Sequence, residues 1–313
     1  MADRIRFLLN ASLARSTVLG YKRAWVLFAN CMLQLNIAFK GLSSIPLEIN
    51  QLLLFIGFMN LSGYAPTSIM TYISAIGYTH RIKGITDPTS SHPVQKLLAA
   101  VLRVNKKKDT RLPITLTILY RLISSLHHTT SSLYLRALFR AMYTVSFFGL
   151  MRMGEVTRDQ FGKVCVYFSQ VSFYEDCIII QITDFKFNQN GDPFDIVLTR
   201  NQNKAICPVN ALYSYLKYRG TKPGPLFCFP DLTSISREFY ASQLKHNLSF
   251  CGLDPNLYQT HSFRIGGCSY LALIGMTNEQ IRLMGRWKTD AFKLYIRCER
   301  ILQSINNKGT FAA

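Results

Sequence analysis

Apolar residues recur at the three-to-four-residue spacing of amphipathic helices through the first third of the chain, from about residue 13 to residue 104. The pattern is broken at four places, namely Gly41, Gly63, Gly84 and the Pro/Ser/Thr-rich segment 87–93. The intervals between the breaks suit four or five short helices. Two of these, over 16–25 and 65–76, begin with residues that favour a helix start. Residues 1–104 are therefore predicted to form a helical domain.

The remainder of the chain mixes helical and strand-like patterns. Helices are predicted over 114–126 and 131–148, and another begins at Pro208 and continues to Arg219. Alternating or β-branched apolar runs predict three strands, over 164–168, 177–183 and 194–199. The last two are expected to pair as a hairpin across the turn 188–193. The fold class is thus α+β, mainly helical, with a small antiparallel sheet in a second domain over 114–313.

The charge of the chain predicts a polyanionic partner. The chain has 36 Lys and Arg against 17 Asp and Glu, a formal net charge of +19. Residues 1–112 carry 14 basic and 4 acidic residues, and residues 113–313 carry 22 and 13, so both domains are basic. A positive surface shared by two domains suits a clamp around a nucleic-acid duplex. Composition alone fits a ribosomal or RNA-binding protein equally well.

The segment 105–113, Asn-Lys-Lys-Lys-Asp-Thr-Arg-Leu-Pro, is charged, polar and closed by proline, and it is the predicted boundary between the domains. It suits a solvated linker, a contact to the nucleic-acid backbone or, more weakly, a nuclear import signal. The sequence leaves these three interpretations open.

Cysteine usage and hydropathy exclude several protein classes. The 8 cysteines form no CxxC pair, and most lie within apolar runs, as expected for free thiols in a reducing compartment. Neither the Cys and His spacing nor the carboxylates suggest a metal site. Apolar runs such as 52–59 fall short of the roughly 18 residues needed to span a bilayer. The first residues, Met-Ala-Asp-Arg-Ile-Arg, lack the features of a signal peptide.

The last fifth of the chain contains residues suited to chemistry on a phosphate. His261 and Arg264 are three residues apart, so on a helix both face one side and can approach the same anion. Arg152, far upstream, offers a second guanidinium. Two arginines can each present paired donors to the oxygens of a phosphodiester, which gain charge in the transition state. The phenol of Tyr295 can attack the phosphorus as a covalent nucleophile.

These residues occur in motifs that resemble those of the tyrosine recombinases, the phage-integrase-like superfamily, and most closely those encoded by eukaryotic mobile elements of the Crypton, Ngaro and DIRS kind. The resemblance is strongest over residues 145–300 and extends loosely over the chain. The matching motifs follow in order: Gly149-Leu-Met-Arg152-Met-Gly-Glu155, Phe185-Lys186, Cys207-Pro-Val-Asn-Ala-Leu212, His261-Ser-Phe-Arg264-Ile-Gly-Gly267, Gly285-Arg286-Trp287 and Tyr295-Ile-Arg297.

The resemblance implies a role for each residue. Arg152 and Arg264 bind the phosphate, and Tyr295 is the nucleophile. His261 serves as a base or donor, and Lys186, for which Lys163 and Lys204 are rivals nearby in sequence, protonates the leaving 5′ oxygen. Two further residues support these five. Trp287 donates to a phosphate oxygen, and Glu155 orients a neighbour. No cofactor or metal ion is implied, because arginines supply the positive charge.

Two departures from bacterial relatives concern the end of the chain. Trp287 and Tyr295 are eight residues apart where many relatives have nine, so Tyr295 is expected on a short helix that begins near Asp290. Tyr270 is the rival nucleophile by sequence. The tail over 299–305 can form an amphipathic helix, which the resemblance places on a neighbouring protomer, with docking on its own domain as the alternative.

The sequence therefore predicts a site-specific DNA recombinase of the transposon-integrase type, acting through a 3′-phosphotyrosine and a Holliday junction. The resemblance implies a helical core-binding (SAM-like) domain over 1–104, a linker over 105–113 and a catalytic domain over 114–313, together a C-shaped clamp on double-stranded DNA. Four protomers would act on two duplexes in the nucleus, and no membrane is expected among the partners. Helices over 16–23 and 65–72 are candidates to lie near the DNA groove or simply to pack.

Three other functions remain open in the sequence. A domesticated DNA-binding protein would keep the fold without catalysis, and a type IB topoisomerase would share the nucleophile and arginines but only relax supercoils. An RNA-binding role fits the charge, but the chain lacks the aromatic sheet motifs of common RNA-binding modules.

Overall fold

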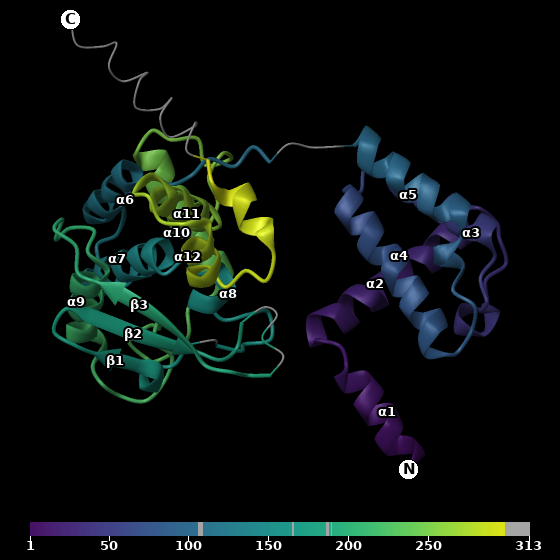
Figure 1. Ribbon diagram of the computed structural model, residues 1–313, viewed down its shortest axis with the longest axis horizontal. Helices are drawn as coiled ribbons and strands as arrows, with labels where there is room; N and C mark the ends of the chain where they lie inside the picture. The colour runs from purple at the N-terminus through teal and green to yellow at the C-terminus, as the bar shows by residue number, and fades with distance from the viewer. Residues whose placement is uncertain (106–108, 165, 186–187, 189, 298–313) are drawn as a thin grey trace, which may run out of the picture. The chain divides into compact units, whose positions relative to one another are not determined.

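The computed structural model describes all residues except 106–108, 165, 186–187, 189 and 298–313. The chain divides into two compact units, Met1–Asp109 and Thr110–Ala313, and each is described by itself. Figure 1 shows both units with their elements labelled. Among the described residues, no helix combines the length and the apolar character that crossing a bilayer requires.

The first unit is helical, as the apolar periodicity predicts. Its elements are α1 (Ala2–Ala11), α2 (Arg15–Gln34), η1 (Gly41–Ser44), α3 (Ile49–Leu61), α4 (Pro66–Ile82), η2 (Pro88–Ser90) and α5 (His92–Val104), where η marks a 3₁₀ helix. Helices α2, α3, α4 and α5 fall in the stretch predicted to hold four or five helices, and α1 precedes it. Pro66 occupies the first turn of α4, where its missing N–H has no intrahelical partner to lose.

Apolar side chains of α2, α3, α4 and α5 form the core of this unit. Phe28 of α2 lies at its centre, edge-on to Phe39 and Phe55 with both ring centroids 5.1 Å away. His80 is fully buried there, and its ring Nε2 accepts a hydrogen bond from the Leu47 N–H at 3.1 Å. His80 is thus part of the core of this unit.

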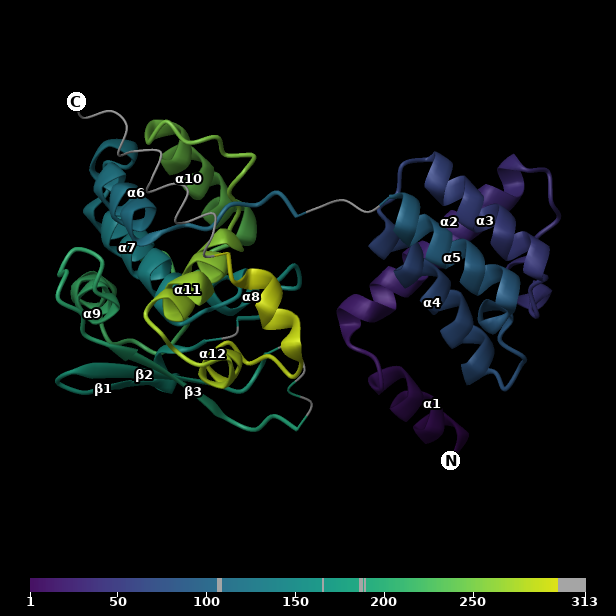
Figure 2. The same ribbon diagram turned by 45° about the horizontal axis from the view of Figure 1, so that its top comes forward.

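The second unit packs helices against one face of a three-stranded sheet. Its elements are α6 (Leu116–Thr129), α7 (Leu133–Phe148), α8 (Met153–Val156), η3 (Phe168–Gln170), β1 (Val171–Phe173), β2 (Cys177–Ile182), β3 (Phe194–Thr199), α9 (Pro208–Arg219), α10 (Arg237–Phe250), α11 (Ser262–Leu273), α12 (Asn278–Met284) and η4 (Asp290–Tyr295). Helix α7 is buried on nearly all sides and contacts α6, α9 and α11. Figure 2 shows the sheet along one side of this unit.

The sheet has the order β1-β2-β3 and is antiparallel throughout. Strands β2 and β3 pair from Ile182 opposite Phe194 to Cys177 opposite Thr199, which confirms the predicted hairpin. Alternate residues are buried along both strands, so one face of the sheet packs on the helices while the other is exposed. The α+β, mainly helical fold class is confirmed.

The strand predicted over 164–168 is wrong. Val166 and Tyr167 are extended, but they lie against residues 224–226 and not in the sheet. The Leu226 N–H donates to the Val166 carbonyl at 3.0 Å, and Tyr167 forms an isolated bridge with Pro225. The first strand of the sheet is instead β1, only three residues long, which is too short to show an alternating pattern.

Two glycines in α11 allow its backbone to approach its neighbours closely. A Cβ on Gly266 would lie 1.8 Å from the Ile114 carbonyl oxygen, and a Cβ on Gly267 would lie 2.2 Å from the Phe147 carbonyl oxygen. Both distances are shorter than any contact between these atoms. Helix α11 is thereby held against the start of the unit and the end of α7.

We expect Gly266→Ala to destabilise the second unit by about 1–3 kcal/mol or more, because backbone atoms block the added methyl group. The control is Gly20→Ala in α2, where nothing lies within 4 Å of the added Cβ. There alanine should stabilise the helix by up to about 1 kcal/mol. Trp25 in the first unit and Trp287 in the second are the two tryptophans of the chain. If one of them is replaced by Phe, the fluorescence of the other during urea unfolding reports on its own unit alone. Equal effects at the two positions would contradict the close approach.

Candidate active site

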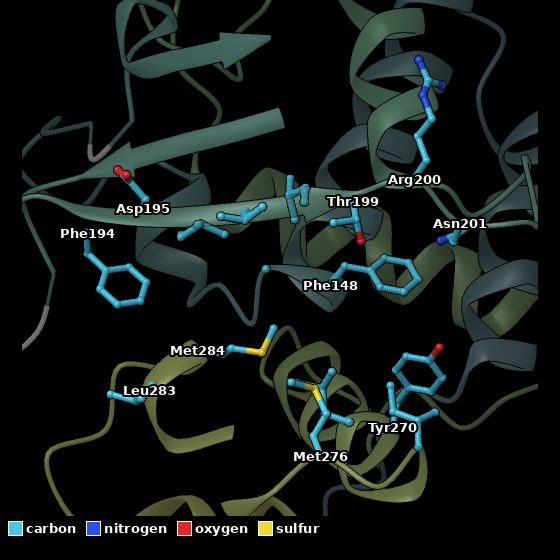
Figure 3. A pocket seen from close by; sticks show the side chains of 16 residues that line it. Phe148, Phe194, Asp195, Thr199, Arg200, Asn201, Tyr270, Met276, Leu283 and Met284 are labelled. Carbon is cyan, nitrogen blue, oxygen red and sulfur yellow. The ribbon is translucent and has the colours of Figure 1, made fainter. Parts of the chain in front are cut away.

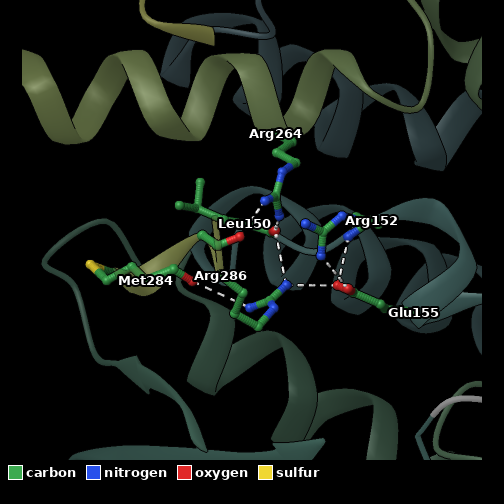
Figure 4. Close-up of polar contacts among 7 residues, drawn as sticks. Leu150, Arg152, Glu155, Arg264, Met284 and Arg286 are labelled. Atoms are coloured by element: carbon green, nitrogen blue, oxygen red, sulfur yellow. Dashed lines mark hydrogen bonds and ion pairs between the residues drawn. The ribbon is translucent and has the colours of Figure 1, made fainter. Parts of the chain in front are cut away.

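Three separate segments bring the predicted residues of the second unit together. Arg152 immediately precedes α8, and Arg264 lies in the first turn of α11 with His261 as its N-cap. Tyr295 is the last residue of η4, which begins at Asp290 as predicted. Figure 4 shows the guanidinium groups of Arg152 and Arg264 beside a third, that of Arg286.

The carbonyl of Leu150 is a common acceptor for two of these arginines. Arg264 donates to it through Nη1, and Arg286 donates through Nη2 at 3.3 Å. Leu150 is fully buried and has φ +47°, an unusual conformation for a residue with a bulky side chain. Its side chain packs in a small apolar cluster with Cys268 and Phe292, which holds the strained turn in place.

Arg264 is the most buried cation of the site, with 1% of its surface exposed. Its Nη2 donates to the Gly285 carbonyl, and its Nε has no hydrogen-bond partner among the described residues. Burial, together with the charges of Arg152 and Arg286, lowers the pKa of Arg264 to about 9. A buried guanidinium with unused donors beside other cations is stabilised by an anion.

Glu155 is the carboxylate that allows these cations to lie together. Its side chain is 5% exposed and forms ion pairs with Arg152 at 2.8 Å and Arg286 at 2.7 Å. It also accepts the Arg152 backbone N–H at 2.8 Å. Burial alone would raise the pKa of Glu155, but the charges of Arg286 and Arg152 outweigh it and the pKa is lowered. One carboxylate against three arginines leaves the cluster with a net positive charge.

Arg286 was not singled out by the sequence analysis, although it lies within the Gly285-Arg286-Trp287 motif. It has φ +58° and is 6% exposed, so it forms a tight turn inside the unit. Its guanidinium lies 5.5 Å from the ring of Phe194 and 6.0 Å from that of Phe185, which lie on the two sides of the loop between β2 and β3. In the sequence, only its position between two motif residues could have indicated that Arg286 belongs to the arginine cluster.

The turn at 285–287 also places Trp287 over the site. A Cβ on Gly285 would lie 1.5 Å from the Trp287 ring, so only glycine allows the indole to fold back against this backbone. The guanidinium of Arg264 lies 3.9 Å from the centre of the Trp287 ring, a cation–π contact. Trp287 thus fixes one side of the Arg264 guanidinium.

Tyr295 lies between the two other aromatic rings of the site. Its ring centroid is 5.0 Å from that of His261 and 5.1 Å from that of Trp287, and its side chain is half-buried. The Arg264 guanidinium is 6.0 Å from the Tyr295 ring. Its backbone is fixed as well, because Ser269 Oγ of α11 donates to the Tyr295 carbonyl at 3.0 Å. A phenol is therefore held beside a cationic cluster and an imidazole.

Lys186, the predicted acid, lies outside the described residues, as does the tail over 299–305. The residue before it, Phe185, lies near Arg286. Among its rivals, Lys163 is exposed and forms an ion pair with Asp184 at 2.5 Å. Lys204 instead lines a separate hollow with Arg200.

Tyr270, the rival nucleophile, lies in different surroundings. Its ring packs on those of Phe147 and Phe148, 5.9 and 6.2 Å away between centroids. It lines a largely apolar pocket of about 650 Å³ between β3, α11 and α12. Figure 3 shows that pocket, in which Met276 and Met284 face the strand. The arginines of the candidate site do not line it.

In the part of the chain that the structure describes, no group of three or more His, Cys, Asp and Glu side chains is placed to hold a metal ion. The contacts described above bring seven residues together at the candidate site: Arg152, Glu155, His261, Arg264, Arg286, Trp287 and Tyr295.

No family model and no curated protein matches this chain. Solved structures do, with identities that show the fold alone. A Tn1549 transposon integrase fragment in complex with transposon right end DNA is 16% identical, with a TM-score of 0.65 over 100% of this chain and 98% of that one. A lambda integrase tetramer bound to a Holliday junction is 14% identical, with a TM-score of 0.64 over 95% and 76%.

A third solved structure is XerH site-specific recombinase bound to its palindromic difH substrate, in a post-cleavage complex. It is 16% identical, with a TM-score of 0.63 over 94% of this chain and 79% of that one. The chain thus has the fold of the tyrosine recombinases and integrases.

The Glu155 ion pairs predict a pH dependence of stability. Because the pKa of Glu155 is lowered from its ordinary value of 4.5, its stabilising effect is complete above that pH and is lost as the pH falls below it. Glu155→Gln should cost about 3–5 kcal/mol at neutral pH, since Arg286 stays buried without a counter-charge. The variant should lose less stability on acidification than the wild type.

The measurement is urea unfolding of the second unit from about pH 3 to pH 7. Glu279→Gln is the control, because this exposed carboxylate faces Arg282 across 3.9 Å and should contribute less than about 1 kcal/mol. Parallel pH curves for the wild type and Glu155→Gln would show that the buried pairs do not control acid stability.

Proposed function

We propose that this protein is a site-specific DNA recombinase of the transposon-integrase type, which cleaves and rejoins DNA through a covalent 3′-phosphotyrosine. The observation that carries the proposal is the position of Tyr295, a half-buried phenol 5.0 Å from the His261 ring and beside a cationic cluster in which Arg264 Nε has no hydrogen-bond partner among the described residues. A phosphodiester supplies the anion that such a cluster stabilises. The recombinase fold gives independent support.

In the proposed first step, Arg152 and Arg264 donate hydrogen bonds to the non-bridging oxygens of one phosphate. The Tyr295 oxygen forms a bond to phosphorus while the bond from phosphorus to the 5′ oxygen breaks. The phenol proton passes to His261 or water, and Lys186 donates a proton to the leaving 5′ oxygen. The product is a 3′-phosphotyrosyl link and a free 5′ hydroxyl.

The link conserves the energy of the phosphodiester bond. A 5′ hydroxyl from a second duplex can attack the phosphotyrosine in the reverse reaction, which releases Tyr295 and exchanges the strand. Repetition on both strands proceeds through a Holliday junction. Glu155 and Arg286 hold Arg152 and the turn at 285–287 in position, and Trp287 holds Arg264 and donates to the phosphate.

The proposed active form is a tetramer on two duplexes. Each protomer would clamp double-stranded DNA between its two basic units, with phosphate contacts dominating the affinity. The tail over 299–305 would dock on a neighbouring protomer, for which the apolar pocket beside β3 is a suitable acceptor. The Tn1549 integrase complex with DNA supports the DNA partner, and the lambda integrase tetramer bound to a Holliday junction supports self-association on DNA.

The proposal has two further parts, which rest on the sequence motifs alone. The protein is encoded by a eukaryotic mobile element of the Crypton, Ngaro or DIRS kind, and it acts in the nucleus. A domesticated DNA-binding protein is the first alternative, and a type IB topoisomerase activity is the second. Strand transfer between two duplexes separates recombination from supercoil relaxation.

Covalent capture tests the nucleophile. The protein is incubated in EDTA with a library of nicked duplexes. After cleavage the short fragment beside the nick diffuses away, which prevents religation, so a protein–DNA adduct should appear on a denaturing gel. Tyr295→Phe should abolish the adduct, whereas Tyr270→Phe should retain it because that ring faces the apolar pocket. Salt-sensitive binding without any adduct, on the library or on the ends of a candidate element, would favour the domesticated binding protein.

A leaving-group substitution tests Lys186. Lys186→Ala should lose cleavage of ordinary DNA by about 10²–10⁴-fold, the range of general acid catalysis. Cleavage should recover when sulfur replaces the bridging 5′ oxygen, since a thiolate leaves without a proton. Lys163→Ala and Lys204→Ala are the matched controls and should cleave both substrates. If one of these two variants shows the loss and the recovery instead, that lysine is the acid.

A further inference from the structure

A second group of cations surrounds a hollow of about 490 Å³ on the second unit, where the chain leaves β3 and enters α9. Its lining includes Arg140 of α7, Lys217 of α9, and Arg200 and Lys204 from the segment between β3 and α9. The other lining residues are uncharged: Asn210, Tyr213 and Ser214. The hollow thus combines four positive charges with amide and hydroxyl groups.

The four cations have no carboxylate partner in the described part of the chain. Among the residues that the structure describes, none of them takes part in an ion pair. This differs from the candidate active site, where Glu155 compensates Arg152 and Arg286. Like charges around one hollow repel one another, so an anion bound there would relieve the repulsion.

Neutral acceptors fix both arginines. Arg140 donates from Nε to the Ala205 carbonyl at 2.9 Å and from Nη2 to the Lys204 carbonyl at 2.6 Å. Arg200 donates from Nε to the Glu175 carbonyl at 2.7 Å and from Nη1 to Asn210 Oδ1 at 2.6 Å. Each guanidinium is therefore oriented in advance and keeps further N–H donors and its full charge.

The hollow is separate from the candidate active site. Phe194 begins β3 and lies 5.5 Å from the Arg286 guanidinium, whereas Arg200 directly follows the end of the strand. Six residues of extended strand place these two positions about 20 Å apart. Figure 3 shows Phe194 and Arg200 at opposite ends of β3. One phosphate cannot contact both clusters.

We propose that this hollow is a second anion site, which binds phosphate oxygens through Arg140, Arg200, Lys204 and Lys217. The four cations of the lining carry more positive charge than one phosphate neutralises, so the ligand carries several phosphate groups. Guanidinium groups bind phosphate through paired donors, and the lysines add charge. The phosphates come either from a nucleic-acid backbone or from a free oligophosphate.

The first part of the test uses sodium tripolyphosphate and calorimetric titration of the full chain. If a free oligophosphate is the ligand, binding is saturable and Lys204→Gln/Lys217→Gln weakens it at least about tenfold, since two charge-assisted contacts are lost. Both lysines are exposed, so the variant should fold normally. Lys222→Gln/Lys245→Gln removes the same charge elsewhere and should bind like the wild type.

The second part measures duplex DNA affinity by fluorescence anisotropy at several salt concentrations. If the ligand is a nucleic-acid backbone, Lys204→Gln/Lys217→Gln reduces the slope of log affinity against log salt by about 1.8, and the control reduces it less. Covalent capture should be retained in the first variant, since neither lysine contacts the site of Tyr295. The anion site and the recombinase activity can thus fail independently.

Either result supports the second anion site and identifies the source of the phosphate. The proposal is overturned if Lys204→Gln/Lys217→Gln and Lys222→Gln/Lys245→Gln behave alike in both titrations, because the hollow would then contribute no more than any other pair of surface lysines.

Discussion

Three guanidinium groups share one buried region of this protein because a single carboxylate lies between two of them. Without Glu155, Arg286 would be a buried cation facing Arg152 and Arg264 in surroundings that screen charge poorly. With it, the cluster is stable but not neutral. The remaining positive charge is available to an anion that approaches Arg152 and Arg264. The rest of the second unit holds these side chains in their relative positions.

These relative positions depend on backbone atoms as much as on side chains. The carbonyls of Leu150 and Gly285 both accept from Arg264, and each belongs to a tight turn. The turn at Leu150 joins α7 to α8, and the turn at Gly285 joins α12 to the segment that carries Tyr295. One arginine therefore ties together the two segments that supply the other arginines and the phenol. A change in either turn would alter the position of all of them.

Much of this could be predicted from the sequence, for identifiable reasons. Periodicity places helices such as α2, α4, α6 and α7 and the β2–β3 hairpin, since each is long enough to repeat its pattern, whereas α8 has only four residues. Strand β1 has three residues, and the apolar run before it is extended for another purpose, to pair with 224–226. The role of Arg286 and the cationic hollow depend on helix packing, such as that of α7 on α9, which no local pattern encodes.

The candidate site is joined by contacts between segments far apart in the chain. Arg286 donates to Leu150 across 136 residues and to Glu155 across 131. Such contacts form late, because long loops must close before they are made. A partly folded chain therefore carries Tyr295 without its arginines and has no means of attacking a phosphate. Completion of the fold is itself a safeguard, which keeps the proposed nucleophile inert until the whole domain is assembled.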